Sequence, residues 1–171
     1  MHQTDQLLRL NVGFLINQTV GYSRDFIFES AAIHLHPDLD LRDLSGTTKI
    51  TRASQGLLVQ VQMHACLQAE CVRCLTSFAL PLSIDFTELY AFSANSVSES
   101  GLILPDDHHI NLGPLVREYM LLEIPINAIC KPDCKGLCPI CGNNLNEQAC
   151  HHEPEATDPR LSVLKTLLDP D

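Results

Sequence analysis

The sequence has no apolar run that approaches the roughly 20 residues with which a helix crosses a bilayer. Residues Met1 to Gln6 also lack the basic region and the apolar stretch of a secretory signal. We therefore expect a soluble, cytoplasmic protein with no membrane partner. In a reducing cytosol, the eight cysteines are better explained by a metal site than by four disulfide bonds.

Positive charge is scarce in this chain. It has 11 Lys and Arg against 21 Asp and Glu, which gives a formal net charge of −10 and a pI near 5.1. Because binding to phosphate backbones depends on Lys and Arg displacing counterions, this balance opposes non-specific adsorption to nucleic acid. Any contact with nucleic acid must be local, or must be made through a protein partner.

The usual signatures of catalysis are also missing. The chain has no Gly-rich phosphate loop, no Gly-x-Ser-x-Gly elbow and no dinucleotide fingerprint. Its one His/Glu cluster, His151-His152-Glu153, lacks the His-Glu-x-x-His spacing that puts two zinc ligands on one helix face. A redox role for Cys71 and Cys74 would need a helix N-terminus, whereas the flanking residues predict strand or turn. We predict that the protein is not an enzyme and has no small-molecule substrate.

The N-terminal half is patterned as strands from Leu8 to about Phe92. Val59 to His64 alternates apolar and polar residues, as a half-buried strand does. Turns are predicted at Gly21, His36-Pro37-Asp38, Ser45-Gly46 and Gln55-Gly56. These features predict one meandering antiparallel sheet.

The second half predicts a long mobile loop, a helix, a cysteine-rich lobe and a second helix. The loop covers about 93–110, and apolar residues then recur at helical spacing from Leu112 to Met120, with Asn111 as cap and Pro125 as stop. Asp158-Pro159 begins a C-terminal helix. The predicted fold class is α+β, with a β-rich core over 1–128, a zinc lobe over 129–153 and a C-terminal helix over 154–171, together one structural unit.

Cysteine spacing is the most specific feature of the sequence. Two Cys-x-x-Cys hooks, Cys71/Cys74 and Cys138/Cys141, stand with further Cys and His residues nearby, and zinc prefers four tetrahedral ligands of this kind. We predict one or two structural zinc ions. In the two-ion arrangement, one site joins Cys71, Cys74, Cys130 and Cys134, and the other joins Cys138, Cys141, Cys150 and His152.

Two other arrangements remain open. One ion could be held by Cys71, Cys74, Cys138 and Cys141, or a single cluster could form from the C-terminal cysteines alone. Cys66 ends an alternating strand and is read as a small buried hydrophobe. Three cations, Arg73, Lys131 and Lys135, flank the hooks and are candidate contacts for RNA or a partner, although they can equally offset thiolate charge.

Taken together, these motifs resemble the YceD family, the large ribosomal RNA subunit accumulation proteins. The most specific pieces are Glu70-Cys71-Val72-Arg73-Cys74 and the Cys-Lys-Gly-Leu-Cys-Pro-Ile-Cys-Gly run over 134–142, with Asn-Leu-Asn at 144–146. Weaker pieces are 13–16, 51–52, 56–59, 112–118, Pro125 and 158–160. The resemblance implies a protein needed for normal accumulation or processing of large-subunit ribosomal RNA, with no established enzyme activity.

Two functional hypotheses follow. The first is a non-enzymatic ribosome-biogenesis factor that supports accumulation or processing of the large-subunit (23S) ribosomal RNA. Its partners would be that RNA, a basic ribosomal protein, or both, because an acidic surface suits a basic protein at least as well as naked RNA. The alternative is a zinc-dependent or redox-switched regulatory or adaptor protein unrelated to ribosomes, since oxidation of zinc-bound thiolates releases the metal.

Overall fold

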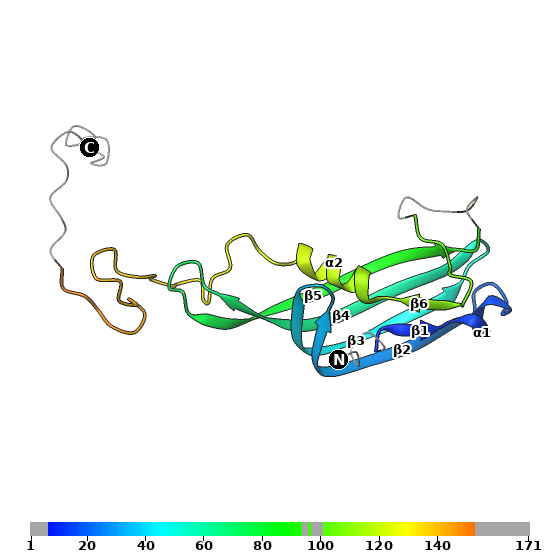
Figure 1. Cartoon of the computed structure of the whole chain (residues 1–171), viewed down its shortest axis with the longest axis horizontal. Helices are drawn as coiled ribbons and strands as arrows, with labels where there is room; N and C mark the ends of the chain where they lie inside the picture. The colour runs from blue at the N-terminus through cyan, green and yellow to red at the C-terminus, as the bar shows by residue number, and fades with distance from the viewer. Residues whose placement is uncertain (1–6, 94–95, 97–100, 153–171) are drawn as a thin grey trace, which may run out of the picture.

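A computed structural model describes residues 7–93, 96 and 101–152 of the chain. The predicted C-terminal helix over 154–171 lies outside the described residues. Most of the described regular structure is antiparallel β, with two short helical segments, so the α+β class holds in its coarse form (Figure 1).

The main sheet is an antiparallel meander, as the sequence predicts, and it has four strands. Its strands are β2 (Ser23–Leu35), β3 (Leu39–Arg52), β4 (Gly56–Glu70) and β5 (Ser77–Ala91), hydrogen-bonded in the order β2-β3-β4-β5. Along β4, Val59, Val61 and Met63 are buried while the residues between them are exposed. One face of the sheet therefore supplies the core and the other faces solvent.

One predicted turn is wrong. Ser45 and Gly46 lie inside β3, where the pairing with β4 is irregular between Arg42 and Ser45. A Cβ at Gly46 would overlap the backbone of Gln62 and Met63 on the neighbouring strand. This glycine therefore allows two strands to approach closely rather than reversing the chain.

The expectation of a single sheet is also wrong. A second, two-stranded sheet pairs β1 (Arg9–Asn11) with β6 (His109–Asn111), and the short helix α1 (Gly13–Ile16) follows β1. Strand β6 and a bridge between Ala91 and Ile103 give regular pairing to part of the segment predicted as a loop. The two strands of this sheet are about 100 residues apart in sequence. A pairing over that distance cannot be detected from local hydrophobic patterns.

Helix α2 (Gly113–Leu122) begins where the sequence predicts and ends three residues before Pro125. The Asn111 side chain accepts a hydrogen bond from the Gly113 N–H at 3.0 Å, which satisfies one unpaired donor of the first turn. Its apolar stripe packs on the sheet, where the Tyr119 ring stacks on Phe86 with centroids 4.0 Å apart. The helix thereby covers the buried face of the meander.

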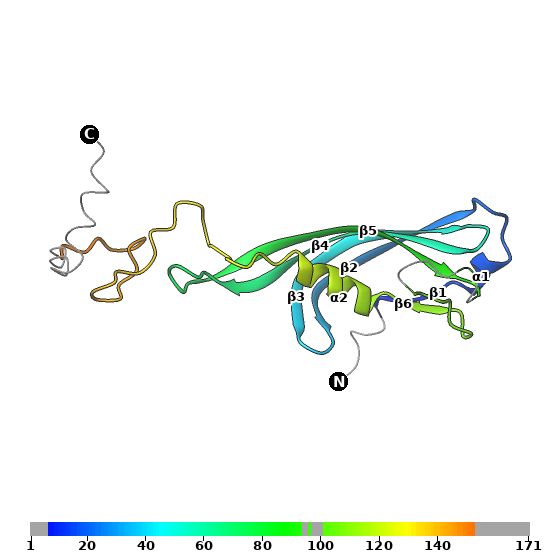
Figure 2. The ribbon, with the colours of Figure 1, turned by 90° about the horizontal axis from the view of Figure 1, so that it is seen from above.

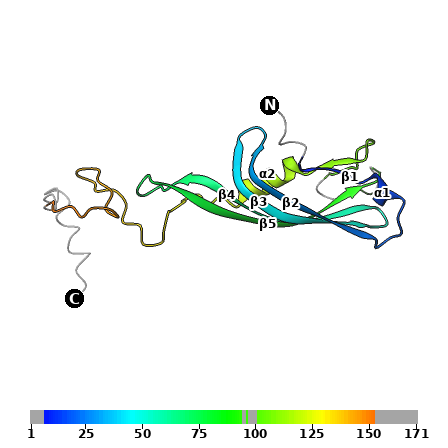
Figure 3. The ribbon, with the colours of Figure 1, turned by 90° about the horizontal axis from the view of Figure 1, so that it is seen from below.

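The core lies between the main sheet on one side and α2 with the small sheet on the other (Figure 2). Its largest fully buried side chains are Leu8, Leu15, Leu41, Leu44, Ile50, Leu57, Met63, Ile110, Leu112 and Met120. Beyond the end of α2 the β4–β5 hairpin continues alone, and residues from about 129 to 152 lie past its tip (Figures 2 and 3). The hairpin tip is thus the junction between the core and the cysteine-rich segment.

Candidate metal centre

The first hook is the turn of the β4–β5 hairpin. Strand pairing continues to Glu70 opposite Ser77, so residues 71–76 form the tip. The tip is closed by the Cys71 N–H donating to the Thr76 carbonyl at 3.0 Å and by the Leu75 N–H donating to the Cys71 carbonyl at 2.9 Å. This closure places the Cys71 and Cys74 side chains together, and both are buried.

The second pair of thiols comes from the chain that follows α2. This segment is fastened to the hairpin tip by the Val72 N–H, which donates to the Ala128 carbonyl at 2.9 Å. Cys130 and Cys134 follow, and their sulfurs converge with those of the tip so that all four lie within 4.8 Å of one another. We call Cys71, Cys74, Cys130 and Cys134 the proximal group.

The geometry of the proximal group fits a tetrahedral ion. Cys71 Sγ lies 3.8 Å from Cys134 Sγ, and Cys74 Sγ lies 3.7 Å from Cys130 Sγ. With zinc–sulfur bonds of about 2.3 Å, the sulfurs of a tetrahedral site are about 3.8 Å apart. A disulfide would need about 2.05 Å, and all four thiols are free. The donor set and its spacing therefore match a thiolate-bound metal ion.

The thiols of the proximal group differ in acidity. Burial raises the pKa of Cys71, but hydrogen bonds from the backbone of Cys130, Cys74 and Arg73 outweigh it and lower this pKa to about 6. The Thr76 side chain lowers the pKa of Cys74. Burial, followed by the neighbouring sulfurs, raises the pKa of Cys130 to about 12. Without a cation, like charges this close oppose the ionisation of all four thiols.

A second set of ligand side chains lies further along the chain. Cys138, Cys141, Cys150 and His152 also bring their ligand atoms within 4.8 Å of one another, and we call them the distal group. The turn between its first two cysteines is closed by the Gly142 N–H, which donates to the Cys138 carbonyl at 2.9 Å. Gly142 has φ of 74°, a conformation that favours glycine.

The distal group is the more open of the two. Cys138 is buried, but Cys141 and His152 are exposed, and Cys141 Sγ lies 3.4 Å from Cys150 Sγ. Backbone hydrogen bonds from Cys141 and Ile140 lower the pKa of Cys138. The nearby Cys141 thiol, with burial second, raises the pKa of Cys150 to about 11.

The two groups correspond to the two-ion arrangement among those left open by the sequence. Among the described residues, no group joins Cys71 and Cys74 to Cys138 and Cys141. Cys66 belongs to neither group and is half-buried in β4. Two cysteine-rich groups that can hold metal ions are therefore present, while the identity of the metal stays a prediction.

All three predicted cations flank the proximal group. Arg73 lies in the hairpin tip and donates through Nη1 to the Cys134 carbonyl at 3.1 Å. Lys131 Nζ lies 3.9 Å from Asp133, and Lys135 is exposed next to Cys134. Arg73 is thus partly engaged in holding the group together, and Lys131 and Lys135 present their charge to solvent.

Sequence reasoning assigned no role to Thr76, Asn144 or Asn146. The Asn146 side chain donates to Cys134 Sγ at 3.4 Å, and Thr76 Oγ1 lies 3.4 Å from Cys74 Sγ. The available signal was the Asn-Leu-Asn run just after the second hook, because polar side chains near thiolate ligands commonly donate hydrogen bonds to them.

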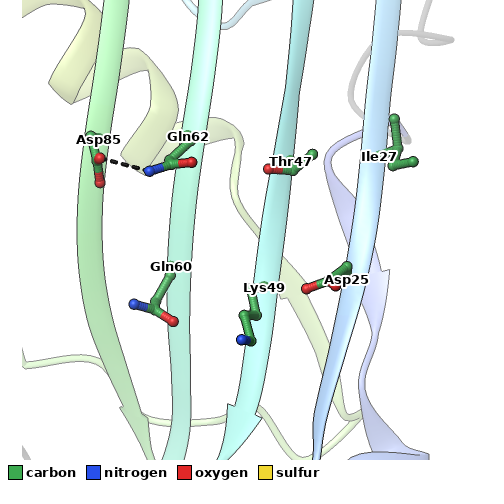
Figure 4. Close-up of a pocket in the computed structure, with 7 residues that line it drawn as sticks. All are labelled: Asp25, Ile27, Thr47, Lys49, Gln60, Gln62 and Asp85. Atoms are coloured by element: carbon green, nitrogen blue, oxygen red, sulfur yellow. Dashed lines mark hydrogen bonds between the residues drawn. The ribbon is translucent and has the colours of Figure 1, made fainter.

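A polar hollow lies on the solvent face of the main sheet, away from both groups (Figure 4). Its volume is about 470 Å³, and it is lined by Asp25, Ile27, Thr47, Lys49, Gln60, Gln62 and Asp85. Gln62 Nε2 donates to Asp85 at 2.9 Å. The lining side chains offer hydrogen-bonding groups and charges of both signs, from Asp25, Lys49 and Asp85.

Within the described part of the chain, no helix is both long enough and apolar enough to cross a membrane.

Comparison with known proteins shows which family and which relatives the chain is similar to. A family model described as "Large ribosomal RNA subunit accumulation protein YceD" matches residues 59–168. The matched region contains most of β4, the hairpin tip, α2 and both cysteine groups. No solved structure matches the chain.

Three relatives illustrate the range of similarity. An uncharacterized protein of Mycobacterium tuberculosis is 33% identical over 140 residues, which are 78% of this chain and 63% of that protein. Uncharacterized protein YlbN of Bacillus subtilis is 30% identical over 103 residues, 59% of this chain and 60% of that protein. In Arabidopsis thaliana, "Large ribosomal RNA subunit accumulation protein YCED homolog 1, chloroplastic" is 41% identical over 63 residues, 37% of this chain and 20% of that protein. The chain thus spans less than two thirds of the length of these relatives.

Proposed function

The chain belongs to the YceD family of large ribosomal RNA subunit accumulation proteins, and from this premise we propose that it is a non-enzymatic ribosome-biogenesis factor. Its role is to support the accumulation or processing of the large-subunit (23S) ribosomal RNA. The observation that carries the proposal is the family match over residues 59–168, which takes in the whole candidate metal centre.

The comparisons favour this role over a redox-switched regulator unrelated to ribosomes. The Arabidopsis relative has large ribosomal RNA accumulation in its name, and the family model carries the same description. A cytoplasmic location stays a prediction, since that plant relative is named as chloroplastic.

In this proposal the partner is the large-subunit ribosomal RNA, a basic ribosomal protein, or both. With a net charge of −10, most of the surface attracts a basic protein and repels phosphate. The exposed Lys131 and Lys135, with Arg73, supply local positive charge beside the proximal group. We therefore place direct contact with RNA, if the protein makes it, at the end of the molecule that carries the cysteines.

Zinc has a structural role in this proposal. When bound, it would join the hairpin tip to the segment after α2 through the proximal group and would hold the distal group as a local turn. All four proximal ligands are cysteines, so no coordination position is left for water or substrate, which supports a structural rather than a catalytic site.

Deleting the gene in its own host tests the ribosomal role. We expect a lower ratio of mature 23S to 16S ribosomal RNA and fewer complete large subunits on a sucrose gradient. A wild-type copy should restore both, as should Cys66→Ser, because Cys66 lies outside both groups. Cys134→Ser, which removes a buried proximal ligand, should restore neither.

A deletion strain with normal 23S levels and a normal subunit profile would refute the proposal. Crosslinking in cells, followed by identification of both RNA and protein, then separates the two partner classes. Reads from 23S ribosomal RNA indicate direct contact, and a basic ribosomal protein without RNA reads indicates contact through protein.

A further inference from the structure

The Asn146 side chain hydrogen-bonds to residues of the proximal group and its surroundings, although Asn146 lies in the loop between Cys141 and Cys150, which we call the distal loop. Its Nδ2 donates to Cys134 Sγ at 3.4 Å, and its Oδ1 accepts from the Lys135 N–H at 3.0 Å. Because the backbone N–H requires an acceptor, the oxygen of the amide must face Lys135 and the NH₂ must face the sulfur. Asn146 lies between Cys141 and Cys150 in sequence, inside the loop that the distal group closes.

Asn144 extends this connection to the hairpin tip. Its Oδ1 accepts from the Asn146 N–H at 3.0 Å and from Asn146 Nδ2 at 2.8 Å. Its Nδ2 donates to Thr76 Oγ1 at 3.3 Å, and Thr76 Oγ1 lies 3.4 Å from Cys74 Sγ. A continuous path of hydrogen bonds therefore runs from Cys74 through Thr76, Asn144 and Asn146 to Cys134.

The chemistry of this path suits a thiolate-bound ion. Four thiolates around a divalent cation carry a formal charge of −2, and hydrogen-bond donors directed at the sulfurs stabilise that charge. Asn146 supplies one such donor. Thr76 can supply another, because its oxygen already accepts from Asn144 and its hydroxyl hydrogen is then free to point at Cys74.

The backbone holds the same two parts together. The Leu137 N–H donates to the Arg73 carbonyl at 3.1 Å, and the Leu145 N–H donates to the Gly136 carbonyl at 2.9 Å. The first bond fastens the residue before Cys138 to the hairpin tip, and the second holds the chain on the two sides of Cys138 together. The distal loop itself has few large apolar side chains, so its shape depends on the ligands that close it.

We propose that Asn144 and Asn146 couple the two cysteine groups, so that a zinc ion in the distal group strengthens zinc binding in the proximal group and the reverse. The distal ion closes the loop that carries the two asparagines, and the asparagines complete the hydrogen bonding around the proximal sulfurs. Since coupling between two sites is reciprocal, each ion raises the affinity for the other by the same factor. This inference rests on the proposed zinc binding and concerns residues that are not themselves ligands.

The test measures zinc release from the intact protein with a chromogenic chelator, after elemental analysis has given the zinc content. Alkylation of Cys134 and Cys141, followed by mass spectrometry, assigns each release phase to the proximal or the distal group. Asn146→Ala should speed proximal release about 10- to 100-fold, as loss of hydrogen bonds to metal ligands commonly does. Asn146→Asp should speed it further, because it places a carboxylate beside a thiolate.

Two further variants serve as comparisons. Asn144→Ala should have a smaller effect in the same direction, since Asn144 does not touch a sulfur. Asn143→Ala is the matched control, because no hydrogen bond of the Asn143 side chain is present among the described residues, and it should release zinc at the wild-type rate. Circular dichroism of the sheet checks that each variant is folded.

The release rate of a double variant distinguishes coupling between the two groups from a simple loss of structure. Cys141→Ser, which weakens the distal group, should speed proximal release in the wild-type background but add little in Asn146→Ala, because the asparagine path is already broken. Additive effects in the double variant, or a wild-type release rate in Asn146→Ala, would overturn the coupling. A wild-type protein that binds no zinc would overturn the proposed metal binding itself, and elemental analysis separates that result from the first two.

Discussion

The sheet and the cysteine-rich segment of this chain are held together by different forces. The sheet, α2 and the small sheet share one continuous apolar core, with side chains such as Ile50, Val59 and Met63 fully buried. In the described part of 129–152, the buried side chains are Cys134 and Cys138. Burial of apolar surface stabilises the first region, but the second region buries too little apolar surface to be stabilised in this way.

The two cysteine groups depend on the sheet to different degrees. Half of the proximal group, Cys71 and Cys74, is carried by a hairpin whose strands pair to its tip. The distal group is entirely local, with all its members between residues 138 and 152. The proximal group is therefore partly positioned before any metal binds, which lowers the ordering cost of binding there.

Removing zinc should have the largest effect, and it should affect only one of the two regions. Binding of structural zinc is worth about 10 to 16 kcal/mol in small zinc-dependent folds. After strong chelation we expect residues 129–152 to lose protection from proteases, while the sheet retains its cooperative thermal transition. Limited proteolysis with mass spectrometry, run beside circular dichroism, measures both regions in one sample.

Cys134→Ser should reproduce the effect of chelation on the cysteine-rich segment, and Cys66→Ser serves as the control because Cys66 is a thiol outside both groups. Unchanged protection of residues 129–152 in metal-free protein would show that this region does not need metal. In that case the contrast between the two regions fails.

A cavity in the core should have the next largest effect, on the opposite region. Ile50 is fully buried in β3, so Ile50→Ala should lower the free energy of unfolding of the sheet by about 2 to 5 kcal/mol. Ile27 on the solvent face is 76% exposed, so the same chemical change there, Ile27→Ala, should cost under about 0.5 kcal/mol. Denaturant unfolding gives both values.

Neither isoleucine variant should change the zinc content. A loss of zinc in Ile50→Ala, while the sheet is still folded, would mean that the metal groups draw their stability from the core.

The local sequence pattern predicted those helices and strands that are specified by residues close together in the chain. Val59 to His64 shows its strand through alternation, and Leu112 to Met120 shows its helix through spacing. Pairing of β1 with β6 could not be found in this way, because each strand has three residues and the partners lie far apart in sequence. Gly46 was misread because a glycine that permits close strand approach looks the same in sequence as one in a turn.

Prediction of the candidate site divides along similar lines. Ligand types and the Cys-x-x-Cys spacing are local, so they pointed to the hooks and to the residues that now form two groups. Seeing that the side chains form two groups rather than one needed the fold, since it is the path after α2 that returns Cys130 to the hairpin tip. The Asn-Leu-Asn run could suggest that Asn146 donates to a thiolate, but only the fold identifies that thiolate as Cys134.

Alkaline pH should have the smallest effect. It should lower the stability of the sheet without changing the zinc content of the cysteine-rich segment. Burial, together with the negative charge of Glu88, raises the pKa of Tyr90 to about 12. In the unfolded chain a tyrosine has a pKa of about 10, so the core favours the neutral phenol. This contribution to stability is fully present below pH 10 and is lost as the pH rises from about 10 to about 12. At pH 11 the loss is about 1.4 kcal/mol.

Tyr90→Phe removes the ionisable group while keeping the ring, so the free energy of unfolding of this variant should fall less between pH 9 and pH 11 than that of the wild type, by about 1 kcal/mol. Denaturant unfolding of the sheet at the two pH values measures the difference. Thiolate ligands are already deprotonated when bound, so the zinc content should not change over this range. Equal pH dependence in the two proteins would mean that Tyr90 ionises as readily in the folded core as in the unfolded chain, and the core would then be less dry than its burial implies.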